Sequence, residues 1–289
     1  MAGFVDYWCN AFTPEYAPRW ARAIERQGIP LKVRTDDRDS FADPDDFVAR
    51  MDEVGMEVVL LPTVDEPDRA GELDYEGFAT STGRLRALHG AHPTRFRGLY
   101  TIDPTRGWDG AREAEARLTE SAFVGLHLHT HSWDRAFDHR DLYPFYGVAA
   151  EHGVPVVVQA GTSGGLAPSE CGRPVGIDRP ALYFRDLRFV LSHTGWPWGD
   201  EAMAMALKHP NVFLGTAAYP PRHWSSDLVR FLKGPGRGKT LFGTSFPVVG
   251  HRHALGQLDE LALPEDARME LLGGAARRVF GRLPQGHAT

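Results

Sequence analysis

Polar side chains able to carry or accept a proton stand near the ends of several apolar runs in the sequence. They are Asn10, His127, His129, Gln159, His193 and Ser245. An imidazole has an unperturbed pKa of about 6.5, so it can accept and release a proton near neutral pH. Amide and hydroxyl groups can hold a carbonyl oxygen or a developing oxyanion. This combination predicts acid/base chemistry on a small oxygenated molecule.

His193 is the strongest candidate for a general acid/base. It lies near the end of an apolar run and precedes "TGWPW", a turn marked by Gly and Pro. The alternative interpretation is a structural histidine that holds this loop. Asp6 could orient His193 or a substrate hydroxyl; the alternative for Asp6 is a structural role at the bottom of the fold.

His127 and His129 are two residues apart on a predicted strand, so both side chains face the same side. We expect them to transfer protons or to bind substrate. In a second hypothesis they join His131 and His193 in a metal site built from imidazole ligands.

Asn10, Gln159 and Ser245 are candidate oxygen-binding groups. Their amide and hydroxyl groups could hold a substrate carbonyl in a dry pocket. The alternative is that they fill space and satisfy one another's hydrogen bonds.

Aromatic residues also gather at or just past predicted strand ends. They are Trp8, Trp196, Trp198, Tyr219 and Phe246. Rings at one mouth suit a flat apolar or aromatic substrate, although core packing explains any single one of them. Four cationic or titratable residues lie on later loops, namely Arg222, His223, His251 and His253. They could contact a substrate carboxylate or phenolate, but we expect them to be exposed loop residues.

Apolar runs alternate with helical patterns along the chain. The predicted strands cover residues 3–9, 56–62, 95–102, 122–129, 154–161, 187–195, 211–217 and 239–245. Each is followed by a helical pattern or by room for one. In the helix predicted at 43–55, Asp43 is the expected N-cap, Pro44 opens the first turn and Gly55 ends the helix.

Continuous apolar strands separated by helices indicate a parallel sheet that is covered on its outer face. Eight such units in 289 residues fit a closed (β/α)8 barrel, so we predict an α/β fold with one TIM-barrel domain over residues 1–289. Chemistry in such barrels lies at the C-terminal ends of the strands. The irregular stretch 162–180 is typical of a lid or binding loop.

The composition is that of an ordinary globular protein, with 42% hydrophobic and 24% charged residues and a net charge of −6. It offers no basic field for nucleic acid, no apolar run as long as a membrane helix and no signal-peptide pattern. Two cysteines make no disulfide framework, which predicts a cytoplasmic protein. The expected partner is a small-molecule substrate, and a homodimer is one option for the oligomeric state.

Several segments resemble the amidohydrolase-related family, in the amidohydrolase 2 branch that includes decarboxylases, lactonases and hydratases. The segments, in the family's order, are "FVARMDEVGMEVVLLP", "HPTRFRGLYTIDP", "DLYPFYGVAAEHGVPVVVQAG", "LRFVLSHTGWPW", "KTLFGTSFP" and "ELLGGAARRVFG". They span nearly the whole chain. The resemblance implies the family's barrel fold, and it places the frequent acid/base histidine of the sixth strand at His193.

The family binds its metal with a D-x-H-x-H run on the first strand, a His on the fifth and an Asp on the eighth. In this chain the first run reads "DYWCN", so Trp8 and Asn10 replace the histidines, while Gln159 and Ser245 stand at the other two positions. Tryptophan offers only a donor, and neutral amides and hydroxyls are weak ligands for a divalent ion. We therefore expect no metal at this site and no cofactor.

These residues predict a metal-independent enzyme that performs acid/base chemistry on a small oxygenated substrate, aromatic or unsaturated. Elimination, cyclisation, isomerisation, decarboxylation and ester or lactone hydrolysis all remain open. Diverged copies of catabolic folds are often reused in biosynthesis, so by analogy we expect a role in specialised metabolism. The alternatives are a metal-dependent hydrolase or decarboxylase built on His127 and His129, and a non-catalytic protein that binds a small molecule.

Overall fold

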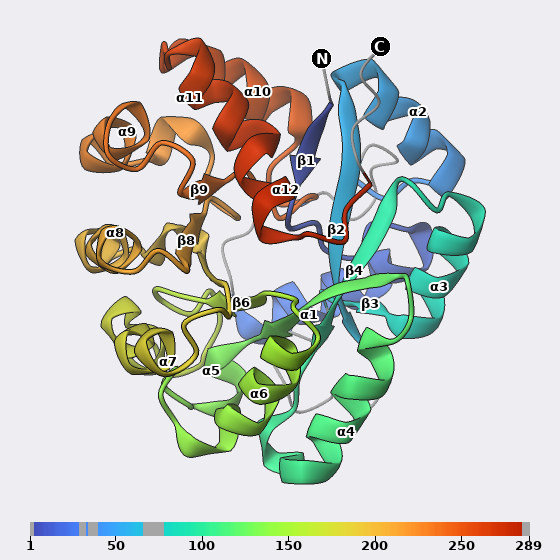
Figure 1. Ribbon diagram of the computed structural model, residues 1–289. Coiled ribbons are helices and arrows are strands. Elements are labelled where there is room, and N and C mark those ends of the chain that lie inside the picture. Colours follow the sequence, from blue (N-terminus) through green and yellow to red (C-terminus); the bar gives the residue numbers. More distant parts are fainter. Residues whose placement is uncertain (1–2, 29–32, 34–39, 66–77, 285–289) are drawn as a thin grey trace.

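The computed structural model describes residues 3–28, 33, 40–65 and 78–284. Eight parallel strands form a ring that helices surround (Figure 1). Its strands are β1 (Phe4–Asp6), β2 (Met56–Val64), β4 (Phe96–Thr101), β5 (Phe123–Leu128), β6 (Val156–Gln159), β7 (Phe189–Ser192), β8 (Val212–Gly215) and β9 (Thr240–Leu241). A ninth strand, β3 (Thr80–Ser81), pairs with β2 outside the ring. The predicted (β/α)8 barrel is confirmed.

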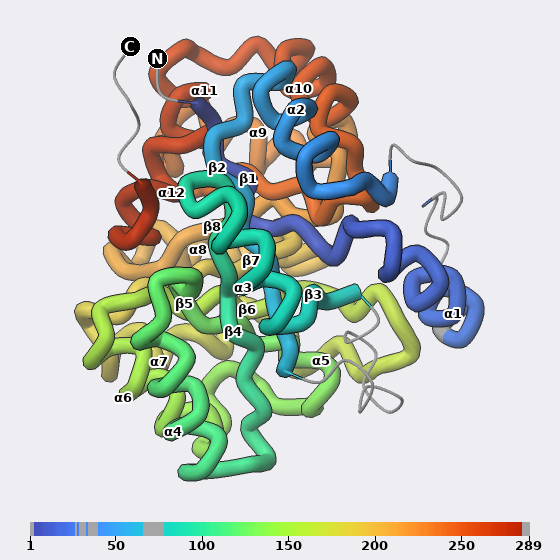
Figure 2. The backbone as a smooth tube through the Cα atoms, turned by 90° about the vertical axis from the view of Figure 1, so that its right-hand side faces the viewer, coloured from blue at the N-terminus to red at the C-terminus, as the bar shows by residue number. Residues whose placement is uncertain are grey.

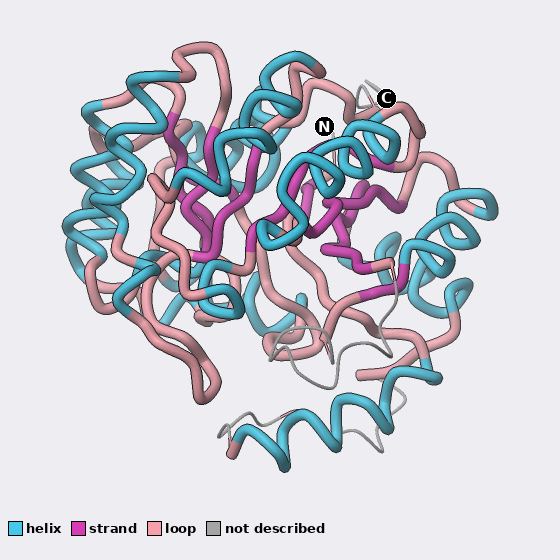
Figure 3. Tube along the Cα trace, turned by 90° about the horizontal axis from the view of Figure 1, so that it is seen from below, coloured by secondary structure: helices cyan, strands magenta, loops and turns pink. Residues whose placement is uncertain are grey.

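Most helices lie outside the strands, so the strand faces are covered, as Figure 3 shows from below. Those of the described residues are α1 (Ala17–Gln27), α2 (Pro44–Val54), α3 (Thr82–Ala91), α4 (Gly107–Leu118), α5 (Thr130–Trp133), α6 (Tyr143–Glu151), α7 (Asp178–Tyr183), α8 (Gly199–Lys208), α9 (Ser226–Lys233), α10 (His251–Glu260), α11 (Glu265–Met269) and α12 (Ala275–Val279). In the side view, α1 lies beside the barrel rather than in the ring of helices (Figure 2). None of the helices within the described ranges is long and apolar enough to span a membrane.

Local sequence explains where many elements begin and end. Helix α2 has Asp43 as its N-cap and Pro44 at its first position, and Gly55 ends it in a left-handed conformation at φ +74°. Glycine adopts this conformation without a Cβ clash. The stretch 162–180 is partly ordered instead of being one loop, because it contains two 3-10 turns and the start of α7.

The first and last strands of the ring are joined by backbone hydrogen bonds beyond their short regular parts. Tyr7 N donates to the Phe242 carbonyl at 3.1 Å, Ser245 N donates to the Trp8 carbonyl at 2.8 Å, and Asn10 N donates to the Phe246 carbonyl at 2.9 Å. These bonds close the barrel and extend its edge to the residues that follow β1 and β9.

The barrel interior is a packed apolar core. Val5, Tyr7, Val157 and Val190 are among its fully buried members. Cys9 belongs instead to the cluster that includes helix residues such as Phe47 and Leu85.

Tyr7 fits the interior only because two glycines face its ring. A Cβ on Gly215 would lie 2.1 Å from the Tyr7 hydroxyl oxygen, and one on Gly243 would lie 2.4 Å from a ring carbon. Both distances are far below van der Waals contact, so these positions exclude any side chain.

Replacing Gly215 by Ala should overpack the barrel and lower the free energy of unfolding by about 1–3 kcal/mol. Urea denaturation followed by circular dichroism measures this. Gly256→Ala in α10 is the matched control, because a Cβ added there would meet no atom within 4 Å and alanine favours a helix. Equal midpoints for Gly215→Ala and the wild type would contradict the packing described here.

Candidate active site

Trp8 follows β1 and packs against two of the candidate histidines. Its ring makes edge-to-face contacts with His127, at 4.7 Å between ring centroids and 89°, and with His193, at 4.9 Å and 90°. Only 1% of Trp8 is exposed. The indole therefore separates two of the candidate histidines and fills the space between them, rather than offering an open stacking surface.

Asn10 and Ser245 are tied to Trp8 by a closed set of hydrogen bonds. The indole Nε1 of Trp8 donates to Asn10 Oδ1 at 3.1 Å, and Asn10 Nδ2 donates to the Ser245 carbonyl at 3.0 Å. The Ser245 backbone N–H returns to the Trp8 carbonyl at 2.8 Å. Both polar atoms of the Asn10 side chain are thus hydrogen-bonded within the protein. This pattern matches the alternative in which Asn10 fills space and satisfies neighbouring hydrogen bonds.

Ser245 differs from Asn10 because its hydroxyl is buried without a hydrogen-bond partner among the described residues. Its backbone is left-handed, at φ +54°, a conformation that serine seldom adopts. A buried hydroxyl without a partner is costly, so a substrate oxygen that accepts its proton would be favoured.

Gln159 is the last residue of β6 and is buried at 7% exposure. Its backbone carbonyl accepts a hydrogen bond from Thr130 Oγ1 at 3.0 Å. It pairs in register with Ser192, the last residue of β7. The two residues therefore stand at the same level of the barrel mouth.

His193 follows Ser192 and turns out of the strand with a left-handed backbone, at φ +60°; Thr194 follows at φ +57°. Such conformations cost free energy in non-glycine residues and are common at functional sites. Ser192 Oγ lies 2.7 Å from Nδ1 of His193. This contact engages Nδ1, and the structure gives Nε2 no hydrogen-bond partner among the described residues.

Burial is the main cause that lowers the pKa of His193 to about 3, and the nearby His131 adds to the shift. The ring is therefore neutral near pH 7. A neutral imidazole can accept a proton, and an anionic substrate bound beside it would raise this pKa.

His127 and His129 both project from the end of β5 and are buried. Their rings lie 6.4 Å apart, with Thr101 Oγ1 2.8 Å from His127 Nδ1 and Ser132 Oγ beside His129 Nδ1. Burial, reinforced by the neighbouring histidines, holds both pKa values well below the usual range. These two histidines are neutral as well.

His131 is also buried in this cluster, 5.7 Å from the His129 ring. Its Nε2 donates to the Gly161 carbonyl at 2.9 Å, so the proton of the neutral ring is on Nε2. Nδ1 is buried with no hydrogen-bond partner in the described part of the chain. The cluster thus contains a second buried polar atom whose bonding is incomplete.

Asp6 is fully buried and is bound by residues that follow β1 and β9. Its carboxylate accepts hydrogen bonds from Trp8 N at 3.0 Å, from Thr244 N at 3.1 Å and from the Thr244 hydroxyl. His251 Nε2 donates to the same carboxylate at 2.9 Å. These bonds link β1 to the segment after β9, so Asp6 orients Thr244 and His251.

The candidate aromatic residues divide into two groups. Trp196, at 56% exposure, lies 6.3 Å from the ring of the half-buried Tyr219, and Trp198 packs against the Arg173 guanidinium. Phe246 is directed elsewhere, because its ring stacks on His251 at 4.8 Å and 16°. The structure therefore brings Trp196 and Tyr219 together and places Phe246 on the side of α10.

A family model described as amidohydrolase matches residues 5–282. The chain belongs to the amidohydrolase family. No curated protein matches the sequence.

Several solved structures share the amidohydrolase fold of this chain. An uncharacterised TIM-barrel protein from Bordetella bronchiseptica has a TM-score of 0.77 at 20% identity, with 98% of this chain and 99% of that one covered. Dihydroxybenzoic acid decarboxylase from a Polaromonas species, with bound manganese and 2-nitroresorcinol, has a TM-score of 0.68 at 20% identity. That match covers 99% of this chain and 98% of the decarboxylase. The 5-carboxyvanillate decarboxylase from Sphingomonas paucimobilis has a TM-score of 0.65 at 19% identity, with 97% of this chain and 99% of the decarboxylase covered. Identities this low support the fold alone.

The residues at the family's metal positions do not fit a divalent ion. Trp8 contributes only an indole N–H, and the Asn10 amide is already bonded to Trp8 and Ser245. At the position of the family's Asp, Ser245 offers a neutral hydroxyl instead of a carboxylate. Among the residues that the structure describes, no three His, Cys, Asp or Glu side chains are grouped to hold a metal.

The sequence patterns do not indicate the contacts of two residues, Ser192 and His251. Ser192 follows the period-two phase of Val190 into the barrel, and that phase could have revealed it. His251 was expected on an exposed loop, which is wrong: it is 8% exposed, begins α10 and binds Asp6. No local signal reveals this contact, because its partner is 245 residues away.

Ser192→Ala should release the His193 ring from its single orientation. The wild-type imidazole is expected to hold one neutral tautomer, and the variant is expected to exchange between two, since Nδ1 loses its partner. Nitrogen chemical shifts of the labelled ring distinguish a fixed tautomer from an averaged one, with no substrate required. Identical shifts in both proteins would contradict a role for Ser192 in orienting His193.

Stability should fall as the pH drops below about 6.5, the usual range of histidine. The folded state keeps His127, His129 and His193 neutral, whereas the unfolded state binds protons, so protonation favours unfolding. Between pH about 6.5 and 5 most carboxylates stay ionised, which isolates the histidine contribution. Thermal melts across this range should show a falling Tm, with a shallower slope in His127→Asn. A flat profile would contradict the buried neutral cluster.

Proposed function

We propose that this chain is an enzyme that performs metal-independent acid/base chemistry on a small oxygenated substrate, aromatic or otherwise unsaturated. His193 is the proposed general acid/base. The observation that carries this proposal is the pairing of His193 Nδ1 with Ser192, which holds a neutral imidazole with its other nitrogen unused. A general base needs a fixed ring with a lone pair directed at the substrate, and a general acid needs a proton at that position.

The substrate oxygen would be held opposite His193. Ser245 offers a buried hydroxyl without a partner among the described residues, and Gln159 lies at the end of β6 beside Ser192. Both are neutral, so they can stabilise developing negative charge on an oxygen without a metal. Asn10 does not take part directly; it fixes the loop that carries Ser245 through its bond to the Ser245 carbonyl.

The neutral histidines explain why an anionic substrate is suitable. A carboxylate or phenolate entering the mouth would raise the lowered pKa of His193 and would draw a proton onto its ring. That proton could then be delivered to a carbon or oxygen of the substrate as it reacts. His127 and His129, packed beyond Trp8 and beside His131, would support this transfer or contact the substrate.

An aromatic substrate is supported by two independent observations. Trp196 exposes its ring next to Tyr219, and flat molecules bind such rings by stacking. The similar structures include decarboxylases of 5-carboxyvanillate and dihydroxybenzoic acid. Among lyase, cyclase, isomerase and hydrolase chemistry, decarboxylation of an activated aromatic acid is the first reaction to test, because its carbanion needs only a proton from His193 when CO₂ leaves.

The proposal is tested on protein purified without a His tag or chelator. We expect elemental analysis to find less than about a tenth of an equivalent of any transition metal. Turnover of a panel of hydroxybenzoic and unsaturated acids, followed by mass spectrometry, should survive chelation. His193→Ala should lower kcat by about 10²–10⁴-fold, the usual share of a general acid/base. His223→Ala, at an exposed histidine, is the matched control and should have no effect.

Two outcomes would replace this proposal. About one equivalent of metal, lost in His127→Ala and His129→Ala, would establish a metal site on β5. Binding of the same acids without turnover, and with only a change of affinity in His193→Ala, would establish a binding protein.

A further inference from the structure

His131 has no part in the proposed chemistry, yet it stands among the strand ends of the barrel mouth. Its helix, α5, begins just after β5. Its Nε2 donates to the carbonyl of Gly161, which lies just after β6. His131 is also close enough to His193, which follows β7, to lower the pKa of that ring. The imidazole therefore lies at the carboxyl ends of three neighbouring strands, where barrel enzymes bind their substrates.

The bond to Gly161 decides what the other nitrogen of His131 can do. A carbonyl only accepts, so Nε2 carries the hydrogen, and because burial lowers the pKa of His131 the ring takes up no second proton near pH 7. Nδ1 therefore presents a lone pair and can only accept. The side chain is 2% exposed, and over the described ranges Nδ1 has no hydrogen-bond partner. A buried acceptor in this state is costly until a donor reaches it.

Backbone packing covers the opposite edge of the His131 ring. A Cβ on Gly172 would lie 2.6 Å from Nε2 and 3.2 Å from Cε1 of His131. The Gly172 carbonyl in turn accepts a hydrogen bond from Gly161 N at 2.8 Å. The next residue, Thr162, donates its N–H to the Trp196 carbonyl at 2.8 Å. The same stretch of chain thus fixes His131 and the exposed Trp196, whose ring is proposed to stack on the substrate.

We propose that His131 is a specificity-determining residue, which accepts a hydrogen bond at Nδ1 from a hydroxyl or amino group of the substrate. This inference rests on the proposed function, since it takes the barrel mouth as the substrate site. Ser245 offers a hydrogen to a substrate oxygen, so a ligand with both an acceptor and a donor would satisfy both buried groups. A molecule without the donor leaves Nδ1 unpaired, and sites of this kind discriminate strongly against such analogues.

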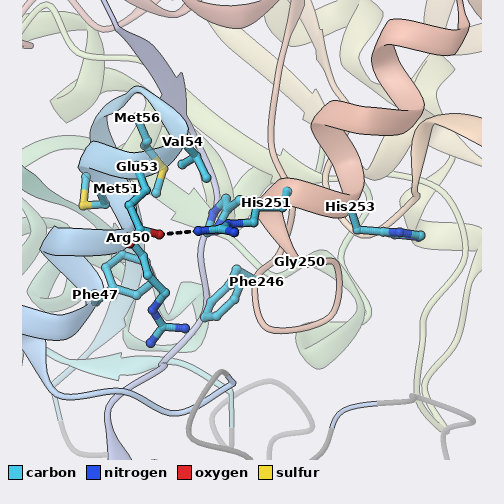
Figure 4. A pocket seen from close by; sticks show the side chains of 11 residues that line it. Phe47, Arg50, Met51, Glu53, Val54, Met56, Phe246, Gly250, His251 and His253 are labelled. Atoms are coloured by element: carbon cyan, nitrogen blue, oxygen red, sulfur yellow. Dashed lines mark hydrogen bonds and ion pairs between the residues drawn. The ribbon is translucent and has the colours of Figure 1, made fainter.

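A separate cavity of about 560 Å³ lies between α2 and the start of α10 (Figure 4). Phe47 and Phe246 line it, and none of the histidines of the barrel mouth does. Small aromatic molecules fit a cavity of this size as well. A test of the proposal must therefore read a signal of His131 itself in addition to an affinity.

The test compares three probes of nearly equal size, 4-fluorophenol, 4-fluoroaniline and 4-fluorotoluene, each titrated with the whole chain. Fluorine NMR measures their affinities, and the nitrogen chemical shift of His131 Nδ1, identified by its absence in the His131 variants below, reports the contact. We expect a donor probe to bind about tenfold more tightly than 4-fluorotoluene and to move the Nδ1 shift, which 4-fluorotoluene should leave unchanged. A preference for 4-fluorophenol alone assigns a hydroxyl group, and one for 4-fluoroaniline alone an amino group.

Two variants separate the acceptor of His131 from its contact with Gly161. His131→Gln keeps an N–H near the position of Nε2 but has no acceptor at that of Nδ1, so the preference for a donor probe should disappear. His131→Asn places an amide oxygen near the position of Nδ1, so it should keep most of the preference although the bond to Gly161 is lost. His152→Gln, directly after α6, is the matched control and should bind the probes as the wild type does.

His193→Ala separates this proposal from the proposed function. A donor preference that persists in His193→Ala supports the role of His131, whether or not any acid is turned over. Equal binding of the three probes, no binding at millimolar probe, or an Nδ1 shift that no probe changes would overturn it, even where turnover is found to depend on His193. If His131→Gln does not fold, His131→Asn and the nitrogen shift of the wild type decide.

Discussion

The junction between the first and last strands is the constraint on which the site depends. Regular pairing is short there, because β1 has three residues and β9 has two. Backbone bonds from Tyr7, Asn10 and Ser245 extend the closure, and the buried Asp6 carboxylate adds bonds to the backbone and hydroxyl of Thr244. A barrel needs every strand edge paired, so this junction must hold before any residue of the mouth is positioned.

Side chains at this junction make direct contacts where the family's resemblance implies a metal. The indole of Trp8, the amide of Asn10 and the backbone of Ser245 form a closed set of three hydrogen bonds. Neutral dipoles in a buried site need no counter-charge. A cation at this position would need one, and these neutral ligands would supply almost no negative charge. The same replacement leaves the hydroxyl of Ser245 without a partner among the described residues, so it is the group of this junction most open to a substrate oxygen.

The sequence predicts the fold well because its signals are local. The run 95–102 corresponds to β4 at Phe96–Thr101, and Gly55 ends α2 as expected. The positions of the replaced ligands also follow from sequence, since their strands are recognisable. Side-chain directions do not: Phe246 turns to α10, and the left-handed backbone at His193 brings two consecutive residues, Ser192 and His193, to one site. Such features depend on contacts between distant segments, which no short pattern contains.

The hydrogen bonds among Trp8, Asn10 and Ser245 and the ring contacts of Trp8 limit how these residues can be replaced. Changing Trp8 alone to His would leave a cavity between His127 and His193 and would deprive the Asn10 oxygen of its donor. Changing Asn10 alone would leave the Trp8 N–H and the Ser245 carbonyl without the partner they share. Each single reversal therefore loses stability before a second ligand exists to bind an ion. Installing metal ligands at these positions would therefore require several substitutions made together.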